Sequence, residues 1–198
     1  MRRLKRVLII AFIAIGLVEL AVGLVFYCIN PPEDSLKAED YPSEFFCDDK
    51  KNYIDYQTKG NCSAYATAYV LRFLGKDVCG EDLAPNMNRV FGFVPAKSIA
   101  QVFKKHGFSA NAYHGDINCL KYRLCSGVPI IAFVSVPNDT HYVVVMGYDD
   151  GYFYLVDSLY ENKNSDSERY NRKITVEEFE SIWKTKTLLS DNIYIAIW

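Results

Sequence analysis

Histidine is scarce in this chain of 198 residues, and two patterns that often mark metal or nucleic-acid binding are missing. There are three histidines, and none of the six cysteines shows the paired Cys-x-x-Cys spacing of a structural zinc site, so we expect no metal and no cofactor. From residue 30 onward the chain carries 18 basic and 23 acidic side chains, since 4 of its 22 Lys and Arg and 1 of its 24 Asp and Glu come earlier. A net charge of −5 without a basic stripe argues against nucleic-acid binding.

The amino-terminal segment resembles a membrane anchor. Residues 7–29 are apolar apart from Glu19, and at about 1.5 Å per residue they would cross a hydrocarbon core of about 30 Å. The basic residues before this run predict a cytoplasmic amino terminus. We therefore expect a single-pass protein of the cell membrane whose domain lies outside the cytoplasm. The alternative is a cleaved signal peptide and a secreted domain.

No internal repeat or low-complexity segment divides the rest of the chain. We expect residues 1–30 to form the signal-anchor, residues 31–52 a charged stalk, and residues 53–198 one globular domain with enough chain for a hydrophobic core.

The hydrophobic pattern of the domain changes from helical to strand-like along the chain. Helices are expected at 62–74, 96–106, 117–126 and 175–184. Strands rich in Val, Ile and aromatic residues are expected at 128–136, 141–148, 152–157 and 192–198. The sequence Asp149-Asp150-Gly151 is a turn signal that joins two of these strands into a hairpin. Helices that precede an antiparallel sheet indicate an α+β fold with helices packed on the sheet.

Two segments supply the groups that cysteine-nucleophile acyl chemistry needs. Cys62 begins a helical run, where the helix amino terminus favours a thiolate. His141 begins one strand of the hairpin and Asp157 ends the other, so imidazole and carboxylate are expected side by side. Gln57 can direct its amide N–H to an oxyanion, together with the backbone N–H of Cys62. We expect Cys62 as nucleophile, His141 as base, Asp157 as the orienting carboxylate and Gln57 as oxyanion donor.

The other cysteines and histidines show no catalytic pattern. Cys28 lies in the apolar amino-terminal run. His106, in the last turn of a helix, and His114, before a glycine, are interpreted as structural. Four cysteines remain: Cys47, Cys79, Cys119 and Cys125. They are compatible with one or two disulfides, in any of three complete pairings, or with free thiols.

Two glycosylation sequons adjoin the candidate site. Asn61 precedes Cys62, and Asn138 lies close to His141. A glycan at either asparagine would obstruct the site. This arrangement favours an exported bacterial protein over one from a glycosylating secretory pathway.

The order of these segments resembles the papain-like cysteine peptidase superfamily and, within it, the bacteriocin-processing (double-glycine leader) peptidase family. The stretch Gln57 to Gly75 is similar to the family's Gln followed by a Cys that opens a helix. His141 to Asp157 is similar to its His-strand-turn-strand-Asp block, and 174–183 to its next helix with a Phe and a Trp. The resemblance covers residues 55–185. It implies a papain-like fold and a thiol protease that hydrolyses a peptide or protein substrate, with the roles given above.

The chain departs from the family pattern beside the nucleophile. Ser63 stands where Gly is usual, Asn61 where Asp is usual, and Gln57 lies one residue closer to the cysteine. The accompanying ATP-binding and transporter segments are absent from this sequence, which points to a stand-alone, membrane-anchored member. Three alternatives remain open: an amidase or acyl transferase of the same superfamily, a non-catalytic peptide-binding domain, and a structural membrane protein.

Overall fold

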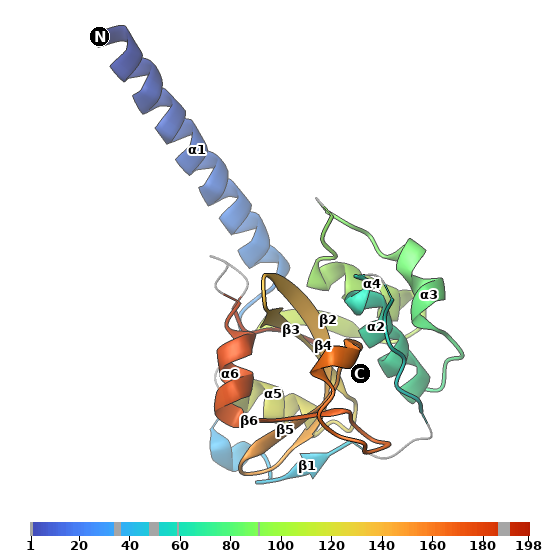
Figure 1. Ribbon diagram of the computed structural model, residues 1–198. Helices are drawn as coiled ribbons and strands as arrows, with labels where there is room; N and C mark the ends of the chain where they lie inside the picture. The colour runs from blue at the N-terminus through green and yellow to red at the C-terminus, as the bar shows by residue number, and fades with distance from the viewer. Residues whose placement is uncertain (1, 34–36, 48–51, 59, 91, 186–190) are drawn as a thin grey trace.

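The computed structural model describes residues 2–33, 37–47, 52–58, 60–90, 92–185 and 191–198 (Figure 1). The α-helices are α1 (Arg2–Ile29), α2 (Cys62–Phe73), α3 (Gly80–Leu83), α4 (Ala96–Lys105), α5 (Ile117–Leu124) and α6 (Val176–Trp183). The strands are β1 (Phe45–Phe46), β2 (Ala110–His114), β3 (Ile130–Val136), β4 (Asp139–Tyr148), β5 (Tyr152–Val156), β6 (Arg172–Thr175) and β7 (Ile193–Ile197). The 3₁₀ helices are η1 (Ala38–Asp40), η2 (Ala84–Asn86) and η3 (Tyr160–Asn162).

Within the described residues, one antiparallel sheet of seven strands organises the domain. Six strands follow the order β2-β7-β3-β4-β5-β6, and β1 pairs with the end of β4. Helices α2 and α4 pack on one side of the sheet, and α5 and α6 pack on the other (Figure 1). The predicted α+β arrangement of helices on an antiparallel sheet is therefore confirmed.

Local sequence accounts for several boundaries. Helix α4 buries Ile99, Val102 and Phe103 along one stripe, and the chain leaves it at Gly107, whose φ of +89° favours glycine. The hydroxyl of Thr175 accepts a hydrogen bond from Glu178 N–H (3.1 Å) and caps the start of α6. These contacts place both helices where the sequence predicted them.

The hairpin of β4 and β5 contains one extra residue. Val145 pairs with Leu155 and Gly147 pairs with Tyr154, so Met146 has no partner on β5 and forms a β-bulge. The turn beyond it is held by Asp149, whose Oδ1 accepts hydrogen bonds from the N–H groups of Gly151 (2.9 Å) and Tyr152 (2.7 Å).

An aromatic row fills the core beneath α6. Phe153 packs on Phe179 (4.5 Å between ring centroids), Phe179 on Trp183 (5.4 Å) and Trp183 on Tyr194 (6.2 Å). The indole N–H of Trp183 donates to the carbonyl of Ile193 (2.9 Å), so its polar group is satisfied while the ring is buried. This row ties α6 to β5 and β7.

Part of the predicted stalk packs on the domain. Strand β1 lies along β4 because residue 147 is glycine: a Cβ there would stand 2.5 Å from the carbonyl oxygen of Phe45. Cys47 is fully buried. Glu33 accepts hydrogen bonds from Arg123 and from the hydroxyl of Tyr194. Residues 34–36 and 48–51 of the predicted stalk lie outside the described residues.

The predicted anchor region forms helix α1, which extends away from the sheet (Figure 1). Among the helices that the structure describes, none combines the length and the apolar character needed to cross a bilayer.

Candidate active site

Cys62 is the first residue of α2, as predicted. The preceding residue, Asn61, accepts hydrogen bonds on its carbonyl from the N–H groups of Ala64 (2.9 Å) and Tyr65 (3.3 Å) and so begins the helix. The Asn61 side chain does not cap the helix; its Oδ1 accepts a hydrogen bond from Arg89 (2.8 Å). The first N–H groups of a helix have no partner within it and point toward its amino terminus. These unpaired donors and the helix dipole stabilise a negative charge, such as a thiolate or an oxyanion.

The hairpin brings His141 and Asp157 together. Val144 pairs with Val156, so Asp157 follows opposite Val143, and His141 lies two residues along the same face. His141 Nε2 and Asp157 Oδ1 are 2.7 Å apart. The Cys62 thiol lies close enough to the imidazole to raise its pKa. The structure therefore brings three of the four predicted residues together.

Asp157 is surrounded by donors that the sequence analysis did not identify. The carboxylate is fully buried, and its Oδ1 accepts a second hydrogen bond from Leu159 N–H (2.9 Å). Its Oδ2 accepts from Asn162 Nδ2 (2.9 Å) and from Arg172 Nη1 (3.0 Å). Both carboxylate oxygens thus carry two donors each, which uses their full hydrogen-bonding capacity.

Asn171 holds the backbone of the same residue. Its Oδ1 accepts from Asp157 N–H (2.8 Å), and its Nδ2 donates to the Asp157 carbonyl (2.7 Å). By its composition, the polar stretch 161–172 is typical of a solvated loop. The one feature of the sequence that pointed to donors around Asp157 was the presence of Asn and Arg residues shortly after the expected catalytic carboxylate.

These contacts set opposite charges on the pair. Burial lowers the pKa of His141, but its hydrogen bonds to Asp157 and Cys62 outweigh burial and raise it to about 9. Burial raises the pKa of Asp157, but its bonds to His141, Leu159 and Asn162 hold it below the ordinary value. At neutral pH the arrangement favours an imidazolium between a carboxylate and the cysteine sulfur.

Gln57 is attached to the same end of the hairpin. Its backbone N–H donates to the carbonyl of Ser158, the residue after Asp157 (3.0 Å). Within the described part of the chain, its Oε1 is buried and has no hydrogen-bond partner. The structure thus places Gln57 beside the catalytic hairpin, and its role as an oxyanion donor stays a prediction.

A cleft of about 150 Å³ opens beside Cys62. Its walls come from the nucleophile loop at Gly60, from β3 and β4 at Phe133 and Tyr142, and from the turn that carries Phe93. Arg89 fixes this turn, since its guanidinium donates to the carbonyl of Gly92 (3.1 Å) as well as to Asn61. The Phe93 side chain remains exposed at the cleft mouth.

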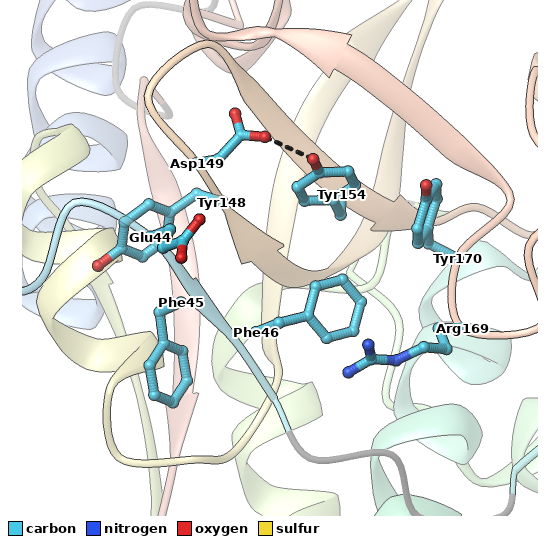
Figure 2. A pocket seen from close by; sticks show the side chains of 8 residues that line it. All are labelled: Glu44, Phe45, Phe46, Tyr148, Asp149, Tyr154, Arg169 and Tyr170. Carbon is cyan, nitrogen blue, oxygen red and sulfur yellow. Dashed lines mark hydrogen bonds between the residues drawn. The ribbon is translucent and has the colours of Figure 1, made fainter.

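A larger hollow of about 520 Å³ lies elsewhere, between β1, the end of β4, β5 and the segment before β6 (Figure 2). Figure 2 shows the Tyr154 hydroxyl donating to Asp149 (2.5 Å) at one end and Arg169 beside Phe46 at the other. None of the four predicted site residues lines it. We therefore place the chemistry at the smaller cleft, where the thiol lies.

The other cysteines and histidines lie apart from this pair. Cys79 and Cys125 are free thiols, and Cys119 is buried in the core. His106 caps the end of α4, and His114 lies on the edge strand β2. Among the side chains that the structure describes, no group of three or more His, Cys, Asp or Glu is arranged to hold a metal ion.

Known proteins share the family and the fold of this chain. The model of the Peptidase C39 family matches residues 50–192. A double glycine motif protease from an AMS/PCAT transporter, solved in complex with a leader peptide, is 21% identical with a TM-score of 0.56, over 74% of this chain and 91% of that one. The peptidase domain of Streptococcus ComA, a bi-functional ABC transporter, is 19% identical with a TM-score of 0.59, over 74% and 98%.

A C39-like peptidase from Bacillus anthracis is 19% identical with a TM-score of 0.56, over 75% of this chain and 98% of that one. No curated protein matches the sequence. The solved structures share the fold, and the family match spans α2 and the hairpin of β4 and β5. The chain therefore belongs to the Peptidase C39 family and is a cysteine-type peptidase.

Proposed function

We propose that the chain hydrolyses peptide bonds through an acyl-enzyme on Cys62. The observation that supports this most directly is the imidazole of His141, which is hydrogen-bonded to the buried carboxylate of Asp157 and lies close enough to the Cys62 thiol for the thiol to raise its pKa. This is the arrangement in which a base activates a sulfur nucleophile and a third group fixes the base.

The chemistry divides into two displacement steps. The Cys62 thiolate attacks the peptide carbonyl carbon, and a carbon–sulfur bond forms. The carbon–nitrogen bond then breaks as the His141 imidazolium gives its proton to the leaving amine. In the second step neutral His141 takes a proton from water, the hydroxide attacks the thioester, and the carbon–sulfur bond breaks to release a carboxylate. The amide of Gln57 and the backbone N–H of Cys62 stabilise the oxyanion in both steps.

The proposed substrate is a peptide or an extended protein segment. A cleft of about 150 Å³ between Tyr142 and the turn at Phe93 has room for about one side chain of an extended peptide and not for a folded surface. The transporter-derived relative was solved with a leader peptide, which supports an extended peptide as the ligand class here as well.

Membrane attachment through residues 7–29 is a separate proposal. It is supported by the apolar sequence of this segment and by the exposed Ile and Leu side chains along α1. The basic residues before it support a domain outside the cytoplasm, at the cell membrane or, after signal cleavage, secreted. Recovery of the full-length chain in the soluble fraction of an alkaline carbonate extraction, together with its absence from the medium, would contradict both forms.

Thiol labelling tests the catalytic assignment without a known substrate. The full-length chain is treated with iodoacetamide from about pH 5 to 9, and mass spectrometry follows each cysteine. We expect Cys62 to react at least about tenfold faster than Cys79 or Cys125 at pH 6, and to lose this advantage in His141→Ala. Equal rates for the three thiols would refute the proposal and favour a non-catalytic peptide-binding domain.

Product analysis tests the reaction itself. A peptide library incubated with the wild-type chain and with Cys62→Ala should give fragments with new carboxyl ends only for the wild type. Fragments joined to an added amine in preference to water would indicate the acyl transferase alternative.

A further inference from the structure

Arg172 is the one cation, among the described side chains, that contacts the catalytic carboxylate without facing the thiol. It lies at the start of β6, pairs in register with Leu155, and places Nη1 3.0 Å from Asp157 Oδ2. Only 12% of its side chain is exposed. A buried ion pair with this geometry is costly to break, because the remaining partner keeps an uncompensated charge.

The buried charge of Asp157 needs a positive partner throughout the catalytic cycle, and His141 is positively charged in only part of it. In the resting pair the imidazolium balances the carboxylate. After proton transfer to the leaving amine the imidazole is neutral, while Asp157 stays fully buried. A carboxylate in that position without a counter-charge would either take up a proton or draw one back onto His141.

We propose that Arg172 is a positioning residue that supplies the permanent counter-charge of Asp157, so that the carboxylate stays ionised while His141 is neutral. The inference rests on the proposed roles of His141 and Asp157. Asn162 shares Oδ2 with the guanidinium at 2.9 Å and fixes the orientation of the carboxylate, so that Oδ1 remains directed at the imidazole.

The other charges around the pair are few. Cys62 faces the imidazole from α2, and Glu178 on α6 lies 3.9 Å from the second guanidinium nitrogen of Arg172. Glu178 is half exposed, so its charge is screened by water and offsets only part of the Arg172 charge. Arg172 therefore weakens the stabilisation of the imidazolium by Asp157. This weakening helps His141 to release its proton as a general acid.

The test is a titration of the His141 ring by NMR in the full-length chain, with specific histidine labelling. Arg172→Met removes the charge and keeps most of the volume. We expect the His141 midpoint to rise by about one pH unit, because a nearby positive charge that disfavoured the imidazolium is gone. Arg172→Lys keeps the charge and should restore most of the wild-type midpoint.

Arg169→Met is the matched control. Arg169 lies three residues away, with its guanidinium 3.9 Å from the Phe46 ring and its Nη2 3.5 Å from the carbonyl oxygen of Cys47. Its variant should leave the His141 midpoint unchanged. A midpoint in folded Arg172→Met within about 0.2 pH units of the wild type would overturn the proposal, since a merely structural Arg172 would affect melting and not the titration.

A second variant decides the case in which Arg172→Met does not fold. His141→Gln removes the imidazolium and leaves Arg172 and Asn162 on Asp157. If Arg172 is the permanent counter-charge, this variant should fold at pH 7 and melt no more than about 10 °C below the wild type, which is the loss expected when the stability linked to the imidazolium is gone. Its failure to fold would show that Asp157 depends on the imidazolium, and would overturn the inference. Since neither measurement needs a substrate, a negative peptidase assay would contradict the proposed function and leave this result standing.

Discussion

Replacing Asp157 by Asn removes one charge from a site where four donors converge. An asparagine keeps one acceptor oxygen and replaces the other with an NH₂ group. The two donors that bonded the replaced oxygen must then face a third donor. If the NH₂ takes the Oδ1 position, it meets the backbone N–H of Leu159. If it takes the Oδ2 position, it meets the guanidinium of Arg172, which cannot become an acceptor. Neither orientation of the introduced amide restores the network.

The expected loss follows from burial. Asp157 is fully buried and Arg172 nearly so, and breaking one partner of a buried ion pair costs about 3–5 kcal/mol. For a domain of this size each kcal/mol lowers the melting temperature by about 2–4 °C, so the fall should be on the order of 10 °C. The neutral side chain also removes the main support of the imidazolium, so Cys62 alkylation at pH 6 should slow toward the rate of Cys125.

Thermal melting by circular dichroism, with iodoacetamide labelling of the same samples, measures both effects. Asp149→Asn is the matched control, because Asp149 accepts three hydrogen bonds in the same hairpin but is only half buried and far from the thiol. It should cost less than half as much stability and leave Cys62 labelling unchanged. Melting of Asp157→Asn within about 2 °C of the wild type would refute the reasoning from a saturated buried anion.

Three further outcomes are expected. Gln57→Ala should lower peptide turnover by about 10²–10³-fold and leave Cys62 alkylation unchanged; loss of both would indicate a structural role. Gly147→Ala should destabilise the fold by about 1–3 kcal/mol in urea titrations, because its Cβ would stand 2.5 Å from the Phe45 carbonyl oxygen, whereas Gly151→Ala, with nothing nearer than 3.9 Å, should not. Since the His141 pKa of about 9 exceeds the ordinary 6.5, the native chain keeps a proton that the unfolded chain loses. Stability should therefore fall by up to about 3 kcal/mol from pH 6.5 to 9, and an equal fall in His141→Gln would contradict this.

The sequence predicted the hairpin of β4 and β5 well because its signals are local. Alternating Val and Ile, the Asp-Gly turn and the helix-forming run after Cys62 each reflect short-range preferences, and together they brought His141, Asp157 and Cys62 into one place. The helices and strands differ from the predicted ranges by one or two residues at most ends, where caps and fraying decide the boundary.

The elements that were missed depend on partners far along the chain. Strand β6 has a single apolar residue, Ile174, among four, and it forms because β5 offers an edge. Strand β2 alternates small and polar residues and is defined by pairing with β7. The donors around Asp157 were missed for the same reason, since a polar segment such as 161–172 usually lies in solvent, and its sequence alone does not show that a carboxylate lies beneath it.

The unpaired Met146 has a consequence for what each half of β4 can contact. Before it, Tyr142 borders the same small cavity as Tyr65 and Tyr69 of α2, so this side chain faces that helix. After it, Tyr148 packs on Phe153 (6.2 Å), which packs on Phe179 of α6, so this side chain, six residues further along, faces the opposite layer. One inserted residue reverses the phase of the strand midway. The two halves of β4 therefore do not share one alternation of side chains between the faces of the sheet. Each half can keep its own set of inward side chains when residues of the other half are substituted.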